Sequence, residues 1–375
     1  MRIERRLEQP WWLSVAVPVG SLVVAFGVMA VVLAVTGHDP WDTYRRMIEA
    51  GFTGNGALSA TLISATPILF TGLAAAAAFR MQLFNIGAEG QLYLGAVGAS
   101  WIALQLGERD VTSTPLFVVL MCVGGCVGGA LWALIPGVLR AFARTNEIIT
   151  SLMLNYVAGL LLTYLIFDSA SYWRDTSTLQ ARAFPQGKPM PIESDWPTFG
   201  SSLVVPLGFL IGIGAAVVLW ALYSRTRFGF EVAVIADSPR AARYAGMRTR
   251  RKILAVMGVS GAMAGIGGAS QIGDFTHTLD GSPSGLQAAA FGYTGIVVAA
   301  LARYNPFAVC LVAVLIGGLQ NAGFTLQGAD FPSGLVGVMQ GIILFCALGG
   351  ELLIRYRVRF TRPRRTSGPA TESAA

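Results

Sequence analysis

The dominant pattern in this chain is a series of long apolar stretches separated by short polar segments. A stretch of about 20 apolar residues is long enough for a helix to cross the hydrocarbon core of a bilayer. The sequence contains ten such stretches, of which the eighth is the shortest. They cover residues 11–35, 57–79, 85–106, 115–139, 148–167, 203–223, 253–272, 286–302, 306–326 and 333–354. The pattern therefore predicts an all-α integral membrane protein with ten transmembrane helices.

The polar segments between the stretches divide the chain into regions. Residues 1–10 form a short amino-terminal segment, and residues 11–354 form the predicted transmembrane domain. Within that domain, residues 168–201 are a long proline-containing outer loop and residues 224–252 a basic cytoplasmic loop. Residues 355–375 are a basic tail that we expect to be disordered.

The distribution of basic residues predicts the orientation. With the amino terminus inside, 21 of the 27 Lys and Arg residues fall in cytoplasmic segments. Such a bias is typical of cytoplasmic loops, so both termini are predicted to be cytoplasmic. The net charge of +7 then reflects topology and contact with anionic lipid rather than nucleic-acid binding.

The ten stretches also allow an internal repeat. Two blocks of five spans each would be antiparallel, because five is an odd number. Glycine interrupts the third stretch at residues 85–95 and the eighth at residues 291–295, which are equivalent positions in the two blocks. Interrupted helices at matching positions are typical of transport sites, so we predict two inverted five-helix repeats.

The third stretch opens with an unusually polar motif, Asn85–Gln91, which contains Glu89. A charged side chain inside a bilayer is costly unless a partner, water or a ligand offsets its burial. Glu89 could contact substrate hydroxyls, pair with Arg80 or Arg144, or cap a broken helix. We expect it one to two turns from the cytoplasmic end of its span.

Other polar and aromatic residues interrupt later stretches. Each could either hold two helices together through a hydrogen bond or contact a solute, with aromatic rings stacking on a base. Together with the motif they form the candidate substrate pathway: Asn85, Glu89, Gln91, Asn155, Phe291, Tyr293, Gln320 and Asn321.

Several chemistries are missing from the sequence. Its two lysines, Lys188 and Lys252, lie outside any phosphate-binding motif of the G-x-x-x-x-G-K-[ST] type. Both histidines fall in predicted outer loops, and the four cysteines lie inside apolar stretches without other soft ligands nearby. The chain is therefore predicted to be no enzyme and to bind no metal or cofactor. Uphill transport would need either an ion gradient or another subunit.

The basic cytoplasmic loop has a helix signal of its own. Residues 230–236 are predicted to form a short ordered segment, Ser238 and Pro239 mark a helix start, and Gly246 ends the helix predicted at residues 240–245. This helix could dock into a groove on another protein. Alternatively, its arginines could hold it against anionic lipid.

Four motifs carry a resemblance to a known family. They are Asn85–Gln91, Thr145–Tyr156, Gly229–Gly246 and Gly292–Leu301. In this order they resemble the permease subunits of bacterial ABC importers for nucleosides and simple sugars, which belong with the ribose and branched-chain amino acid permeases. The chain departs from the family pattern at Ala236 and Ser238, where glycine and asparagine are usual.

The resemblance implies a larger assembly in the bacterial cytoplasmic membrane. A second permease subunit, often a different protein, would complete the pathway. A separate ATPase subunit would use ATP and Mg, and an extracytoplasmic binding protein or lipoprotein would deliver solute, with residues 168–201 as its candidate docking face. An ion-coupled secondary transporter acting alone is the alternative. The implied ATPase-coupling residues are Gly229, Glu231, Ala236, Pro239, Arg240, Ala241, Arg243, Tyr244 and Gly246.

Overall fold

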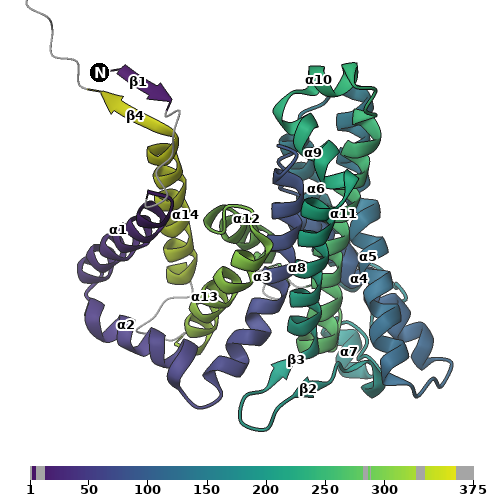
Figure 1. Cartoon of the computed structure of the whole chain (residues 1–375). Helices are drawn as coiled ribbons and strands as arrows, with labels where there is room; N and C mark the ends of the chain where they lie inside the picture. The colour runs from purple at the N-terminus through teal and green to yellow at the C-terminus, as the bar shows by residue number, and fades with distance from the viewer. Residues whose placement is uncertain (1, 6–12, 282–285, 288, 327–333, 360–375) are drawn as a thin grey trace, which may run out of the picture. The chain divides into compact units, whose positions relative to one another are not determined.

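The computed structural model describes residues 2–5, 13–281, 286–287, 289–326 and 334–359. The described chain is mostly helical and divides into two compact units. One unit contains residues 37–337, and the other joins residues 1–36 to residues 338–375. We describe each unit separately (Figure 1).

The smaller unit contains the first and last long helices, which lie against each other. A side chain at Gly350 would meet Ser21 and Val17, so glycine allows the two helices to approach closely. The basic ends of the chain pair as an antiparallel two-stranded ribbon, with Arg2 opposite Arg359. The elements are β1 (Arg2–Arg5), α1 (Leu13–Val35), α14 (Gly334–Arg355), whose first residues belong to the larger unit, and β4 (Tyr356–Arg359).

The larger unit is a helical bundle with short elements at its two ends. Its helices are α2 (Pro40–Ile48), α3 (Ala57–Phe79), α4 (Ala88–Gly107), α5 (Thr114–Val138), α6 (Glu147–Thr163), α7 (Leu179–Ala183), α8 (Leu207–Arg225), α9 (Arg227–Asp237), α10 (Pro239–Tyr244), α11 (Thr249–Gln271), α12 (Phe291–Leu301) and α13 (Pro306–Thr325). Single π-helical turns are η1 (Glu49–Thr53), η2 (Leu139–Ala143), η3 (Tyr164–Asp168) and η5 (Ile272–Thr276), and η4 (Ile192–Ser194) is a 3₁₀ turn. The strands β2 (Thr198–Phe199) and β3 (Val205–Pro206) form a small hairpin.

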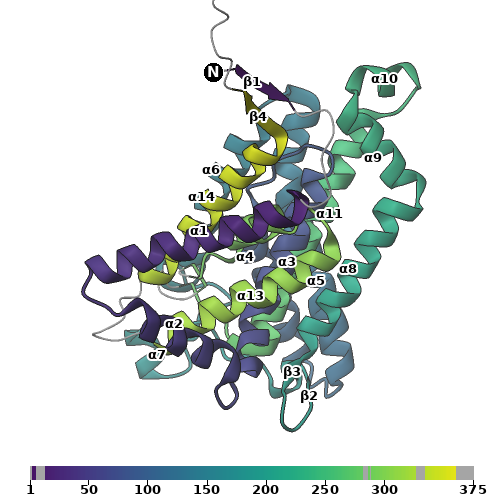
Figure 2. The same cartoon turned by 60° about the vertical axis from the view of Figure 1, so that its left-hand side comes forward.

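Figures 1 and 2 show α9 and α10 at one end of this unit and the hairpin with α7 at the other. We call the first of these the α10 end.

Each predicted apolar stretch contains a helix, but the helices differ in length. Among the described residues, six helical segments are long and apolar enough to cross a membrane. They are Ala57–Phe79, Thr114–Ala143, Glu147–Asp168, Leu207–Arg225, Thr249–Thr276 and Pro306–Thr325. In the predicted eighth stretch the helix begins only at Phe291, because Ala290 adopts a left-handed conformation with φ of 48° and breaks the backbone there.

Helix α3 forms the core of the larger unit. Every residue from Ala65 to Phe79 is buried. The helices that contact α3 most extensively are α8, α11, α12 and α13, all from later in the chain. Hydrogen bonds from the Ser260 hydroxyl to the Ala74 carbonyl and from the Tyr223 hydroxyl to the Ala77 carbonyl link α3 to α11 and α8. The small side chains of α3 let these helices approach on all sides.

Helices α5 and α11 pack in close backbone contact, and this contact predicts a sharp difference between two glycines. A Cβ atom at Gly265 would lie 2.0 Å from the Gly125 carbonyl oxygen, whereas at Gly258, on the same helix, the nearest atom is a Leu134 methyl group at 4.0 Å. We expect Gly265→Ala to lower the free energy of unfolding by about 1–3 kcal/mol or more through overpacking. Gly258→Ala should be neutral or stabilising by up to about 1 kcal/mol, since alanine favours helix. Thermal unfolding of the two purified variants tests this, and equal unfolding temperatures would contradict it.

Candidate functional site

The amino termini of α4 and α12 meet inside the bundle at Glu89. The Glu89 side chain is 2% exposed and accepts hydrogen bonds from the Tyr93 hydroxyl at 2.5 Å and from the Gly292 backbone N–H at 2.5 Å. A Cβ atom at Gly292 would lie 2.2 Å from the Glu89 nitrogen, so only glycine permits this approach. The carboxylate therefore caps the free N–H groups at the start of α12, where the helix dipole favours negative charge.

Asn85 and Gln91 form a second set of contacts beside Glu89. The Asn85 amide donates to the Gln91 side-chain oxygen at 2.9 Å and to the Ser260 hydroxyl at 2.8 Å. The Gln91 amide donates back to the Asn85 oxygen at 3.0 Å, and the Gly87 N–H donates to the same oxygen at 3.0 Å. Both side chains are buried, so these bonds hold the non-helical segment before α4 against α11.

Asn155 of α6 connects the two broken segments. Its side-chain oxygen accepts from the Gly90 N–H at 3.0 Å, and its amide donates to the Ile86 carbonyl at 2.8 Å. The same amide group reaches the Tyr293 hydroxyl at 3.3 Å. The structure thus brings five of the predicted pathway residues into one place. We call Asn85, Glu89, Gln91, Tyr93, Asn155, Ser260 and Tyr293 the central polar cluster.

The central polar cluster lies well inside the bundle, although Glu89 is the second residue of α4 and so lies in the first turn of its own helix. Asn155 is eight residues beyond the start of α6 at Glu147, about 12 Å along the helix. Ser260 is eleven residues beyond the start of α11 at Thr249, about 16 Å along it. Both helices start at the α10 end, so the cluster lies roughly halfway along the bundle. The reason is that residues 80–87 enter the bundle as turn and coil.

The remaining predicted pathway residues lie around a separate cavity, which we call the outer cavity. It has a volume of about 320 Å³ and adjoins η5, near the end of the bundle opposite α10. Two predicted residues, Phe291 and Asn321, line it. Asn321 also donates to the Ala50 and Ala57 carbonyls at 3.2 Å. The described lining residues are Ala60, Ile63, Ser64, Gln271, Phe275, Thr276, Asp280, Leu286, Ala289, Phe291, Asn321 and Phe324.

Gln320 stands beside this cavity without lining it. Its amide donates to the Ala289 carbonyl at 2.8 Å, while its side-chain oxygen is buried and has no hydrogen-bond partner among the described residues. A buried acceptor without a partner is uncommon in proteins.

Sequence reasoning missed several residues of the central polar cluster and of the outer cavity. Ser260 and Gln271 are polar residues within the seventh apolar stretch, the same signal that singled out Asn155 and Gln320. Tyr93 follows the motif by two residues and could have been found as an i,i+4 neighbour of Glu89. Phe275 and Phe324, which are 60% and 56% exposed, carry no pattern that separates them from other apolar residues.

The basic loop forms two helices at the α10 end. Helix α9 is longer than the predicted ordered segment, and α10 spans Pro239–Tyr244, close to the predicted bounds. The Ser238 hydroxyl caps α10 by accepting from the Ala241 N–H at 3.3 Å. Gly246, with φ of 76°, ends the segment in a conformation that glycine adopts without strain.

Helix α10 packs on the bundle along one face and is exposed to solvent along the other. Ala242 is buried, whereas Tyr244 is 94% exposed and Arg240, Ala241 and Arg243 are also exposed. Helix α9 is fixed beneath it: Glu231 forms an ion pair with Lys252 of α11 at 2.8 Å. A Cβ atom at Gly229, in the first turn of α9, would lie 1.9 Å from the Tyr223 carbonyl oxygen, so the close approach of α9 to the end of α8 requires glycine. Ala236 and Pro239 line a pocket between α9, α10 and α11.

Comparison with known proteins identifies the family. Residues 57–348 match the family described as branched-chain amino acid transport system / permease component. The chain belongs to this family. It is therefore a permease component and, with its several long apolar helices, a multi-pass membrane protein.

Individual relatives match over most of their length. The glucose ABC transporter permease protein TsgB13 of Haloferax volcanii is 33% identical over 97% of this chain and 95% of its own length. The guanosine ABC transporter permease protein NupP of Bacillus subtilis is 29% identical over 92% and 94%. A second guanosine permease protein of the same organism, NupQ, is 25% identical over 70% and 80%.

Proposed function

We propose that this chain is one permease subunit of an ATP-driven importer that translocates nucleosides or a related simple sugar. The observation that carries the proposal is the family match over residues 57–348, together with relatives described as guanosine and glucose ABC transporter permeases. The geometry of α10 also supports the proposal. This helix is capped and exposed to solvent, and a short rigid helix is suited to dock on an ATPase. ATP and Mg would be used by that separate subunit and not by this chain.

The proposed topology has ten spans in two inverted repeats of five helices, with both termini cytoplasmic. A helix in each predicted apolar stretch supports the count. The meeting of the α4 and α12 amino termini supports the repeat, since these helices lie in the third and eighth predicted stretches, which would be equivalent. In this topology the α10 end faces the cytoplasm and residues 168–201 face outside, in the bacterial cytoplasmic membrane.

The proposed assembly contains a second, different permease subunit. The occurrence of NupP and NupQ as two guanosine permease proteins in one organism supports a pathway made of two proteins. This chain is more similar to NupP than to NupQ and would take the corresponding place. An extracytoplasmic binding protein or lipoprotein would dock on residues 168–201.

The outer cavity is the proposed place where this subunit receives solute. Phe275, Phe291 and Phe324 offer aromatic faces, and Gln271 and Asn321 offer amide groups. A nucleoside has a flat base, which stacks on aromatic rings, and a polar edge and sugar, which form hydrogen bonds. The central polar cluster, whose groups bond one another, would serve as the structural closure beneath it.

Reconstitution of the complete transporter tests the function. With its ATPase, second permease and binding protein, the chain should support ATP-dependent uptake of labelled guanosine or labelled glucose. A substitution of the ATP-binding lysine in the ATPase should abolish uptake. ATP-independent uptake by this chain alone would overturn the proposal in favour of an ion-coupled secondary transporter.

A single substitution tests the outer cavity. Gln271→Leu keeps the side-chain size but removes a hydrogen-bonding group from the cavity wall. We expect the maximal rate of guanosine uptake to fall about two- to tenfold, corresponding to one hydrogen bond of about 0.5–1.5 kcal/mol. Gln105→Leu, on α4 and outside the cavity, is the comparison variant; because Gln105 donates to the Tyr172 hydroxyl at 3.1 Å, the affinity of both variants for the binding protein is measured alongside uptake. Equal rates for the two variants would remove the cavity from the pathway.

A further inference from the structure

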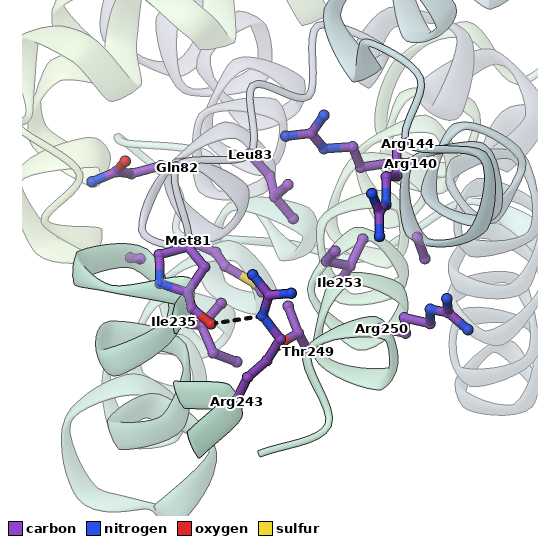
Figure 3. Close-up of a pocket in the computed structure, with 13 residues that line it drawn as sticks. Met81, Gln82, Leu83, Arg140, Arg144, Ile235, Arg243, Thr249, Arg250 and Ile253 are labelled. Atoms are coloured by element: carbon purple, nitrogen blue, oxygen red, sulfur yellow. Dashed lines mark hydrogen bonds between the residues drawn. The ribbon is translucent and has the colours of Figure 1, made fainter. Parts of the chain in front are cut away.

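A second pocket lies at the α10 end, apart from the outer cavity, and its lining is basic. Its volume is about 600 Å³, and its walls come from the segment between α3 and α4, η2, α9, α10 and the start of α11. Figure 3 shows the guanidinium groups of Arg140 and Arg243 directed into the space between these elements. We call it the arginine pocket. Its lining residues are Met81, Gln82, Leu83, Arg140, Ala141, Arg144, Ile235, Ala236, Pro239, Arg243, Thr249, Arg250 and Ile253.

Part of the positive charge of the arginine pocket is uncompensated, that of Arg144 and Arg243, whereas the Arg250 guanidinium lies over the Phe142 ring at 5.3 Å. Of its four arginines, Arg140 forms an ion pair with Glu147 at 3.2 Å. Arg144, Arg243 and Arg250 form no ion pair with any carboxylate in the described part of the chain. The Arg243 Nε–H donates a hydrogen bond to the Pro239 carbonyl. The terminal N–H groups of this guanidinium are left free to bind a ligand. Like charges gathered in this way repel one another unless an anion joins them.

The start of α11 adds further donors on the same side. This helix has 23 residues, and the side chain of its N-cap residue, Arg248, makes no capping hydrogen bond within the described part of the chain. The Thr249 N–H donates to the Met247 carbonyl at 3.0 Å, and the N–H groups of the next residues present partial positive charge next to the pocket. The Thr249 hydroxyl lines the pocket and is buried without a hydrogen-bond partner among the described residues. A buried hydroxyl without a partner beside a helix terminus and several guanidinium groups is a donor set for an oxyanion.

The remaining walls indicate that the anion belongs to a larger molecule. Met81, Leu83, Ile235 and Ile253 provide apolar surface beside the charged groups. A volume of about 600 Å³ exceeds what one phosphate ion needs, and matches the usual size of small-molecule sites. The pocket therefore suits a phosphate group with an organic remainder.

We propose that the arginine pocket binds a phosphate group carried by a soluble phosphate monoester or by an anionic lipid headgroup. Guanidinium groups match the geometry of phosphate oxygens through paired N–H donors. A bound phosphate would join Arg243 of α10 to Arg144 and to the start of α11, and so restrain α10 against the bundle. The pocket would thus make the position of the exposed helix depend on its occupant.

Binding to the full chain in nanodiscs, with its copurifying subunits, tests this inference. Inorganic phosphate and guanosine monophosphate are the soluble probes in neutral phosphatidylcholine discs, and phosphatidylglycerol discs form the lipid arm. At least one arm should raise the unfolding temperature, and native mass spectrometry should detect the bound phosphate compound. Arg144→Gln and Arg243→Gln should each weaken that binding tenfold or more. Arg251→Gln, an exposed arginine that lines another pocket, is the matched control and should leave it unchanged.

The outcomes separate this site from the transport pathway. Guanosine lacks the phosphate, so it should not compete with guanosine monophosphate for the arginine pocket. Binding in neither arm would overturn the proposal, as would equal weakening by Arg251→Gln. The unfolding temperatures of the unliganded variants show whether each has kept its fold. Binding of guanosine alone would overturn this inference while leaving the proposed transport function intact.

Discussion

Replacing Tyr244 with aspartate is expected to abolish transport while leaving the permease folded. The Tyr244 side chain is 94% exposed on α10, so its loss removes almost no packing within this chain. If α10 docks on the ATPase, an aromatic residue at such a place is a typical hot spot, whose loss costs about 2 kcal/mol or more. ATPase copurification should then weaken about thirtyfold, and guanosine uptake should fall to background.

Two measurements keep the α10 prediction specific. Tyr244→Phe retains the ring and should keep most of the activity, which separates docking from a general disturbance of the helix. The unfolding temperature of Tyr244→Asp should equal that of the unmodified chain. If Tyr244→Asp copurified with the ATPase as before and still transported guanosine, α10 would not be the coupling helix.

Glu89→Ala is expected to produce the largest loss of stability among single substitutions in the central polar cluster. It would leave the Gly292 N–H and the Tyr93 hydroxyl buried without their acceptor. At about 1–3 kcal/mol for each unpaired group, the free energy of unfolding should fall by about 2–6 kcal/mol. Thermal unfolding in detergent, compared with Glu89→Gln, measures this loss. Glu89→Gln retains an acceptor oxygen and should lose less.

The same substitution decides between the interpretations of Glu89. Tyr93→Phe removes one donor, so a Tyr93→Phe, Glu89→Ala double variant should lose less than the sum of the two single effects. A carboxylate that mainly contacts solute would behave differently. Glu89→Ala would then retain its unfolding temperature and lose uptake, and that result would contradict the capping role.

The positions of the helices could be predicted from the sequence because hydrocarbon imposes a strong length requirement. Stretches such as residues 57–79 and 306–326 coincide with α3 and α13 within one residue at each end. The short helix α10 was also predictable, since Ser238, Pro239 and Gly246 are local start and stop signals. Such signals depend only on neighbouring residues.

What the sequence could not predict depends on contacts between distant residues. The depth of Asn85–Gln91 is set by Ser260 and Asn155, which lie 175 and 65 residues away along the chain. The late start of α12 depends on the left-handed conformation of Ala290, a residue type that usually favours helix. The outer cavity combines side chains from α3, η5 and α13, which no local pattern brings together.

The burial of α3 also constrains how the protein is made. Its principal partners, α8, α11, α12 and α13, all lie later in the chain, and the last ends at Thr325, 246 residues after Phe79. At 5–20 residues per second, the ribosome needs roughly 12–50 s to supply them. During that time the small-residue surface of α3 must remain in contact with lipid or with the insertion machinery. Packing around α3 is therefore completed late, and biogenesis has a long interval in which the central helix lacks part of its partners.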